Sequence, residues 1–450
     1  MHSGDSAIEM ALTQHLCLRQ NQGNRRRSNK SISEIASELV KISDTPGLLR
    51  YWGYPLETHT AHTIDGWELD IFRIPFSPFS DTPKKRHPIL LYHGLSTTSA
   101  IWLCHPSRNL ALYLSNLGFD VFLANFRGSI YTRHKHLGRT QLEFWDFSID
   151  DLQKDVEAVV NHILQATEAS QLIYLGFSQG TAACFLSLAK NKALNAKIAA
   201  FIAMAPAIKP QADFFFFSKL MVRPNLIYQV SPHSFFPISL TLRNLIPASM
   251  YQKLISFSMS SLFGWNHAEF HKDARVALYS HLFGDSSTKV YAHWFQILHY
   301  NEFVNFNDCR CMSLSLRVLT QSLRDRLTNP FREKRTKAQE ESQKAAYENP
   351  MAVKSKCACR PSKIPTDLIT APTYLFFGSE DQMTDESYFR KNVSGIKEWI
   401  RIEGYDHMDF VWSERVEEKV WIPMMDILDR LESLEEKGSD DLTPSFIPDK

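Results

Sequence analysis

The sequence Gly176-Phe-Ser178-Gln-Gly180 constrains this chain most, because it joins a predicted strand at Leu172–Leu175 to a predicted helix at Thr181–Lys190. A serine at so sharp a turn stands at the carboxyl end of a sheet strand with its hydroxyl accessible. The flanking glycines leave room where two chain segments approach closely. The helix that follows directs its N-terminus toward an oxygen that becomes negative during acyl transfer. The turn therefore predicts that Ser178 is a nucleophile.

Short apolar strands alternate with helices on both sides of this turn. This alternation is typical of a mostly parallel sheet with helices on both faces, so we predict the α/β fold class. An Asp65-Gly66 turn also predicts a hairpin near the start of the chain. The other strands that we expect are His59–Thr63, Glu68–Ile74, Pro88–Tyr92, Asp120–Ala124, Ala199–Ala205, Ala371–Phe377 and Glu398–Ile402, and the other helices are Arg108–Leu117, Ser148–Ala166 and Val416–Leu434.

A nucleophilic serine needs a general base and an acid that orients it, both on loops after later strands. Asp381 follows the strand Ala371–Phe377, and His407 follows the strand Glu398–Ile402. Their order and spacing fit, so we interpret Asp381 as the acid and His407 as the base. Three other carboxylates compete for the role of the acid, although each is ordinarily interpreted as a surface group: Glu380, Asp385 and Asp406.

Backbone amides should stabilise the oxyanion. One should come from Gln179, the residue after the nucleophile. The other should come from the loop after an earlier strand, where His93-Gly94-Leu95 ends a buried apolar run. We therefore expect an oxyanion hole built from the N–H groups of Leu95 and Gln179.

Several further motifs resemble those of one family: RYWGYP (50–55), LLYHGL (90–95), FDVF (119–122), ANFRG (124–128), FWDFS (144–148), GFSQG (176–180), HWFQ (293–296) and DHMDFVW (406–412). Together they are similar to the acid-lipase family of α/β-hydrolases, which includes gastric and lysosomal lipases and intracellular steryl ester hydrolases. The segments LFGW (262–265) and HLFGDSSTKVYAHWFQ (281–296) look closest to the fungal-type steryl ester hydrolases.

This resemblance implies the α/β-hydrolase fold, a triad of Ser178, Asp381 and His407, and an inserted cap (lid) domain over the site. We accordingly predict five parts of the chain: a polar N-terminal tail at 1–47, a hydrolase core at 48–206 and 364–434, a cap at 207–305, a basic and disordered insertion at 306–363, and a polar tail at 435–450.

Two features of the insertion and the cap admit more than one interpretation. Cys309-x-Cys311 and Cys357-x-Cys359 could suggest zinc, but zinc ligands are usually separated by two or more residues, so we expect no metal and no cofactor. The run Phe214–Phe217 could form an apolar rim that opens at a lipid surface, or it could be part of an ordinary core helix.

The composition narrows the partners and the location. A net charge of +1 gives no global attraction to nucleic acid. The first residues lack the apolar run of a signal peptide, and no window long enough to span a bilayer occurs. We therefore expect an intracellular protein, peripheral on a membrane or a lipid droplet.

The sequence thus predicts a serine hydrolase that acts on neutral lipid esters, with steryl esters first and triacylglycerols second on resemblance alone. An acyltransferase or a short-chain carboxylesterase with the same triad is the alternative. A non-catalytic lipid-binding or scaffold protein on the same fold is an alternative of another class.

Overall fold

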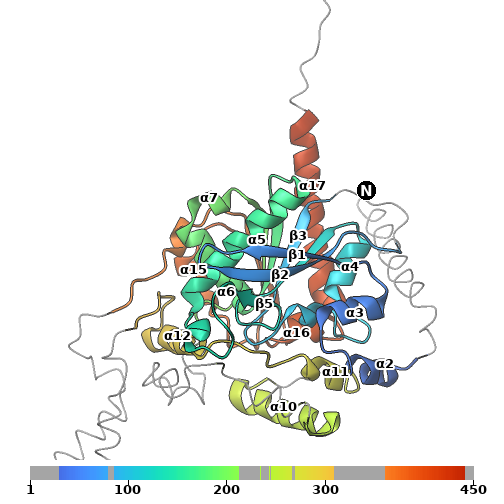
Figure 1. Cartoon of the computed structure of the whole chain (residues 1–450). Coiled ribbons are helices and arrows are strands. Elements are labelled where there is room, and N and C mark those ends of the chain that lie inside the picture. The colour runs from blue at the N-terminus through green and yellow to red at the C-terminus, as the bar shows by residue number, and fades with distance from the viewer. Residues whose placement is uncertain are drawn as a thin grey trace, which may run out of the picture.

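The computed structural model describes residues 30–79, 86–211, 234, 243, 245–265, 269–308 and 360–440. A nine-stranded sheet lies at the centre of this part of the chain (Figure 1). The order of its strands is β1-β2-β4-β3-β6-β7-β8-β9, and β5 pairs with β2. The strands are β1 (Glu57–His62), β2 (Trp67–Ile74), β3 (Pro88–Tyr92), β4 (Asp120–Ala124), β5 (Thr132–His134), β6 (Leu172–Phe177), β7 (Ile198–Met204), β8 (Thr373–Gly378) and β9 (Ile396–Ile402).

The strands from β4 to β9 across the sheet run parallel, whereas β1, β2 and β5 pair antiparallel. Parallel strands carry apolar side chains on both faces, because helices cover both faces. In β3, for example, Leu91 belongs to one apolar core cluster and Leu90 to the other. The predicted fold class, a mostly parallel sheet between two helical layers, is confirmed.

Helices α5 and α6 contribute to one of these clusters, and α4 and α17 contribute to the other. Short 3-10 and π turns extend some helices, and α17 continues a π turn at Glu417–Trp421. The helices are α2 (Ile32–Leu39), α3 (Thr45–Trp52), α4 (Leu110–Asn116), α5 (Leu152–Thr167), α6 (Gln179–Lys190), α7 (Lys192–Asn195), α10 (Ala248–Phe263), α11 (Arg275–Ser280), α12 (Thr288–Tyr300), α15 (Glu386–Asn392), α16 (Asp409–Trp412) and α17 (Ile422–Asp440).

The described part of the predicted N-terminal tail, residues 30–47, is folded, which corrects that prediction. Ser31 and Glu34 form a reciprocal capping box at the start of α2. Ile35 and Leu39 of the same helix are buried in the core cluster that also holds α4. The segment is polar in overall composition, yet its few apolar side chains recur at helical spacing and enter this core cluster.

Helices α10, α11 and α12 come from the segment 207–305 and lie along the lower side of the molecule in Figure 1. The predicted rim Phe214–Phe217 and most of the basic insertion lie outside the described residues. The two sides of that insertion meet, because Asn305, the residue just before it, donates its N–H to the carbonyl of Ser362 near its end at 2.9 Å. None of the described helices is both long enough and apolar enough to cross a membrane.

Candidate active site

Ser178 occupies a strained turn between β6 and α6. Its backbone has φ 54° and ψ −119°, a conformation that costs a non-glycine residue on the order of 1–3 kcal/mol. A Cβ atom on Gly180 would lie 2.5 Å from the Tyr92 carbonyl oxygen, and one on Gly176 would lie 2.9 Å from the backbone of Gly180. Both flanking positions therefore require glycine, as the sequence pattern predicted.

The structure brings Ser178, His407 and Asp381 into one chain of hydrogen bonds. His407 Nε2 lies 2.7 Å from Ser178 Oγ, and His407 Nδ1 lies 3.1 and 3.0 Å from the two carboxylate oxygens of Asp381. Since a carboxylate only accepts, Nδ1 carries the proton and Nε2 is left to accept from the serine hydroxyl. The three side chains come from loops after β6, β8 and β9.

The carboxylate of Asp381 is fixed from its own loop as well. It accepts hydrogen bonds from the Met383 N–H at 2.9 Å and from Thr384 Oγ1 at 3.1 Å. Asp381 and His407 are each only 2% exposed. A buried carboxylate with this many donors keeps one orientation, and it therefore fixes the plane of the imidazole.

The competing carboxylates have other partners. Glu380 is exposed and contacts Ser379. Asp385 caps α15 through the Tyr388 N–H and pairs with Lys209. The Asp406 carboxylate accepts from the Met408 N–H at 3.2 Å and helps to shape the histidine loop. Of the four candidates, only Asp381 hydrogen bonds to His407 in the described residues.

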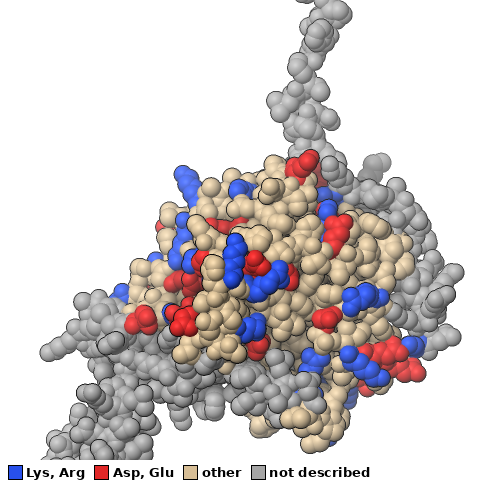
Figure 2. Space-filling view, viewed as in Figure 1, with Lys and Arg blue, Asp and Glu red and all other residues tan. Residues whose placement is uncertain are grey.

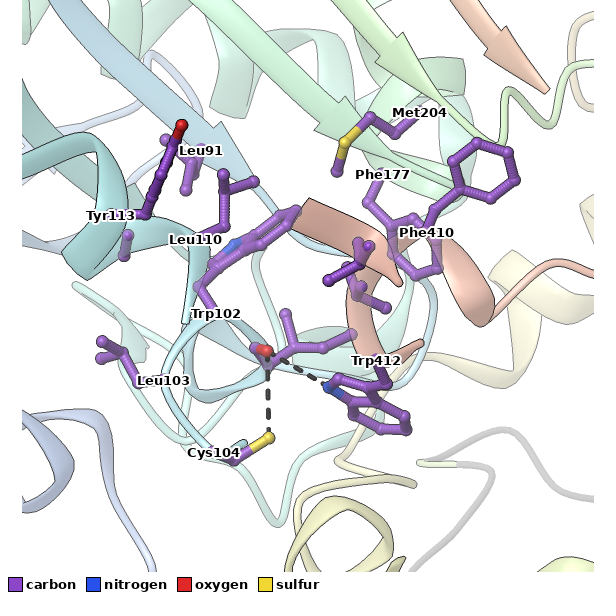
Figure 3. Close-up of a cluster of buried hydrophobic side chains, with 14 of the residues drawn as sticks. Leu91, Trp102, Leu103, Cys104, Leu110, Tyr113, Phe177, Met204, Phe410 and Trp412 are labelled. Carbon is purple, nitrogen blue, oxygen red and sulfur yellow. Dashed lines mark hydrogen bonds between the residues drawn. The ribbon is translucent and has the colours of Figure 1, made fainter. Parts of the chain in front are cut away.

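Apolar packing anchors the loop that carries His407. Directly after it, α16 places Phe410 and Trp412 in the core, beside Trp102 and Phe177 (Figure 3). Trp412 Nε1 donates to the Ile101 carbonyl at 3.4 Å, and Cys104 Sγ lies 3.8 Å from the same oxygen. The loop is therefore attached to the segment after β3 as well as to β9.

A second carboxylate in this loop, Asp409, forms no ion pair with a Lys or Arg among the residues that the structure describes. One of its oxygens accepts from the Asp406 N–H at 2.8 Å. Burial, followed by the neighbouring charge of Asp406, raises the pKa of Asp409 to about 8. The group is therefore held in its neutral form around neutral pH, unlike a salt-bridged carboxylate.

The segment predicted to supply the second oxyanion donor passes beside the nucleophile. A Cβ atom on Gly94 would lie 3.1 Å from Ser178 Cβ, so a larger residue here would crowd the nucleophile. His93 stabilises the turn, because its Nδ1 donates to the Gly94 carbonyl at 2.8 Å and its Nε2 accepts from the Phe126 N–H at 3.3 Å. Burial lowers the pKa of His93 to about 4, so it is neutral when it does so.

The other predicted donor, Gln179, is the first residue of α6 and is buried. Its side-chain Oε1 accepts from Trp294 Nε1 at 3.0 Å, which ties α12 to the turn. The bond joins the HWFQ motif of the segment 207–305 to the turn that carries Ser178.

Sequence reasoning missed one residue at this site, Trp265. Its indole lies over the His407 imidazole with ring centroids 5.2 Å apart and planes only 14° apart. From the sequence, Trp265 was recognised only as part of the LFGW motif. Its distance along the chain from His407 gave no indication that the two rings are in contact.

No group of three or more His, Cys, Asp or Glu side chains arranged to hold a metal occurs in the part of the chain described above. Cys104 and Cys184 are buried free thiols. The four cysteines of the CxC pairs lie outside the described residues.

The fold and this site define an α/β-hydrolase. A family model for "alpha/beta hydrolase fold" matches residues 87–247, and a "Partial alpha/beta-hydrolase lipase region" matches residues 45–106. A probable lipase of Schizosaccharomyces pombe is 30% identical over 413 residues, covering 88% of this chain and 77% of the relative. A second probable lipase of that yeast is 27% identical over 89% of this chain and 83% of its own length.

The gastric triacylglycerol lipase of Rattus norvegicus is 24% identical, covering 85% of this chain and 90% of its own. The chain belongs to the acid-lipase-like family of α/β-hydrolases, as its motifs predicted. Its activity class is that of a lipid ester hydrolase.

Proposed function

We propose that this enzyme hydrolyses the ester bonds of neutral lipids through an acyl-enzyme formed on Ser178. The observation that carries the proposal is the chain of hydrogen bonds from Asp381 through His407 to Ser178 Oγ, with the last contact at 2.7 Å. A hydroxyl at this distance from a neutral imidazole nitrogen is activated by direct proton transfer.

In the first half of the reaction, Ser178 Oγ attacks the ester carbonyl while His407 Nε2 takes its proton. Asp381 holds the Nδ1–H tautomer and stabilises the imidazolium that forms. The backbone amides of Leu95 and Gln179 receive the oxyanion, helped by the N-terminus of α6. His407 then protonates the departing alcohol, and in the second half water releases the fatty acid from Ser178 by the same proton transfers in reverse order.

The segment 207–305 serves as a cap on the core formed by 48–206 and 364–434. Ser178 is only 9% exposed, and the rings of Trp265 and Trp294, both from this segment, lie close to the site. A long lipid therefore reaches the serine only when part of the cap moves, a common arrangement in enzymes that exclude water from the reaction.

Helix α10 supplies a surface for the lipid phase itself. Tyr251 and Ile255 face the core, whereas Met250, Leu254 and Phe257 are 58%, 42% and 71% exposed. Their i, i+4, i+7 spacing places the exposed residues on one outer stripe, and the surface of the molecule at α10 is mostly uncharged (Figure 2). We assign this stripe to peripheral contact with a membrane or a lipid-droplet surface, because the substrate class of the family is found there.

Steryl esters are the first proposed substrates and triacylglycerols the second. The segments LFGW and HLFGDSSTKVYAHWFQ, which both lie in the cap segment, support the steryl ester. The relatives named gastric triacylglycerol lipase support the second substrate. Ser178 can attack the ester carbonyl of either substrate, so the triad does not distinguish them. We therefore attribute the preference between them to the cap segment.

The test is hydrolysis of cholesteryl oleate, triolein and a short p-nitrophenyl ester by the purified enzyme and by Ser178→Ala. We expect Ser178→Ala to lose roughly 10⁶-fold in kcat on every substrate that the wild type hydrolyses. Thermal unfolding of the variant is the control for its fold. Substantial hydrolysis by folded Ser178→Ala would contradict the proposed nucleophile.

A further inference from the structure

Residues on the C-terminal side of α10 lie close to the His407 loop. Gly264 ends the helix in the left-handed conformation with φ 66°. Ser260 Oγ donates to the carbonyl of the next residue, Trp265, at 2.9 Å. Farther along, the Glu269 carbonyl accepts from the Glu414 N–H at 2.8 Å. The first contact closes the end of α10, and the second attaches the cap at Glu269 to the core just after the His407 loop.

Packing strengthens the same attachment. Phe270 meets Trp412 edge to face, with ring centroids 6.0 Å apart and planes at 78°. Phe270 and Trp265 are both buried, and both belong to the core cluster that holds the histidine loop. Trp265 and Phe270 therefore form one packed unit with the residues just after His407.

Within this unit the indole of Trp265 lies nearly parallel to the imidazole of His407, 5.2 Å away and tilted by only 14°. Phe177, the residue before the nucleophile, also lies 5.2 Å from that imidazole, tilted by 39°. Two aromatic rings thus contact the base, one from the core and one from the cap.

The two hydrogen bonds of His407 leave one motion of its ring unrestrained. Both act in the plane of the imidazole, one at Nδ1 and one at Nε2. They therefore resist movement of the ring within its plane much more than they resist a tilt of the ring about the line from Nδ1 to Nε2. A ring stacked on the imidazole resists that tilt by steric contact. It also excludes water from the base and faces the positive charge that His407 gains when Ser178 gives up its proton.

We propose that Trp265 is a positioning residue for His407, so that the alignment of the base depends on the cap segment after α10 being in place. The inference rests on the proposed function, since it assumes that His407 is the general base. The inference goes further, because it assigns the cap a part in the chemical step. A cap that only controlled the access of substrate would have no effect on that step.

The kinetic test compares Trp265→Ala with Trp265→Phe on a short p-nitrophenyl ester below its solubility limit, where no lipid surface forms. We expect Trp265→Ala to lower kcat by roughly 10- to 100-fold with KM nearly unchanged, since an error of about 1 Å in a catalytic group can cost ~100-fold. Trp265→Phe, which keeps a ring over the imidazole, should restore most of kcat.

Trp399→Ala is the matched control. It removes an indole that contacts Arg390 and Phe377 on the outer part of the sheet, and kcat should stay at the wild-type value. A kcat of Trp265→Ala equal to or above that of the wild type would overturn the inference, because the indole would then act as a simple cover. So would an equal loss of kcat in Trp265→Phe and Trp265→Ala.

Tryptophan fluorescence tests the contact without any substrate. The difference between the emission of the wild type and that of Trp265→Phe reports on Trp265. Because the indole lies over the imidazole, this difference spectrum should change when the imidazole is removed in His407→Gln. A difference spectrum that is the same with and without the His407 ring would overturn the inference.

The two proposals can fail separately. Folded Ser178→Ala that still hydrolyses esters would reject the proposed function, while a Trp265 signal that depends on the His407 ring would leave the stacking intact. Conversely, an inactive Ser178→Ala combined with a fully active Trp265→Ala would support the nucleophile and reject the positioning role.

Discussion

The carboxyl edge of the sheet and helix α10 differ in how far their side chains are buried. At the sheet edge, Ser178, Asp381 and His407 are buried, and each is held by hydrogen bonds or by a strained turn. On α10, only the inner face is buried, and Phe257 is 71% exposed on the outer face. The core thus fixes the three proposed reacting groups in advance, whereas α10 leaves an apolar surface exposed, which we propose contacts lipid.

Trp265 is the described residue that joins these two regions most directly, since it follows α10 and stacks on His407. The two regions should therefore respond differently to substitution. Changes at the sheet edge should lower the rate of ester hydrolysis on every substrate. Changes on the outer face of α10 should lower activity only on substrates that form a lipid surface.

The largest effect should come from Asp381→Asn. An amide that presents its NH₂ group to Nδ1 favours the opposite tautomer, so Nε2 carries the proton and cannot accept one from Ser178. We expect kcat on the short ester to fall roughly 10⁴-fold. Asp385→Asn is the control, because this carboxylate also follows β8 but pairs with Lys209. Similar losses of kcat in the two variants would refute the assignment of the acid.

A smaller effect, on stability, should come from Asp409→Asn. The folded-state pKa of about 8 lies above the unfolded value of 3.8, so the folded protein holds an extra proton between these two values. The contribution of this group to stability is present at and below the unfolded value and is lost as pH rises toward 8. Asparagine cannot ionise, and its carbonyl can still accept from the Asp406 N–H.

Melting temperatures measured from about pH 5 to pH 8 check this sign. Relative to the wild type, Asp409→Asn should gain stability as pH rises, by on the order of 1–3 kcal/mol at the alkaline end. Asp426→Asn, a change at an exposed carboxylate that pairs with Arg430, should follow the wild-type curve. Parallel curves for the wild type and Asp409→Asn would show that burial does not hold this carboxyl neutral.

The smallest effect should come from Phe257→Ser, on the outer face of α10. We expect the ratio of triolein-emulsion activity to short-ester activity to fall roughly 5-fold, which corresponds to the loss of about 1 kcal/mol of Phe burial in lipid. Ile64→Ser removes an even more exposed apolar side chain at the β1–β2 turn, and its ratio should equal the wild-type ratio. A drop in both variants would indicate a general loss of surface apolarity with no special role for α10.

The parts of the site that were predictable from sequence are those set by local geometry. The turn at Ser178 is specified by two glycines between a strand and a helix, and the loops of Asp381 and His407 follow from the strands before them. The parallel sheet was predictable because its buried strands are nearly continuous apolar runs. All these features can be recognised within about ten residues of the chain.

The features that escaped prediction depend on contacts between distant segments. The neutral state of Asp409 depends on how deeply its loop is buried, and the position of Trp265 depends on the path of the cap across the core. Helix α2 is different, since its signals were readable in Ser31, Glu34 and the apolar residues that follow. The polar composition of the first residues concealed a helix of only eight residues.

Covalent labelling by a fluorophosphonate is the most direct test of the central claim, that Ser178 is activated by His407 and Asp381. Folded wild-type enzyme should be modified on one peptide, that of Ser178, in an active-site titration followed by mass spectrometry, and His407→Gln should react far more slowly. Folded wild-type enzyme that resists the probe, or that is modified at another residue while ester hydrolysis stops, would contradict the account.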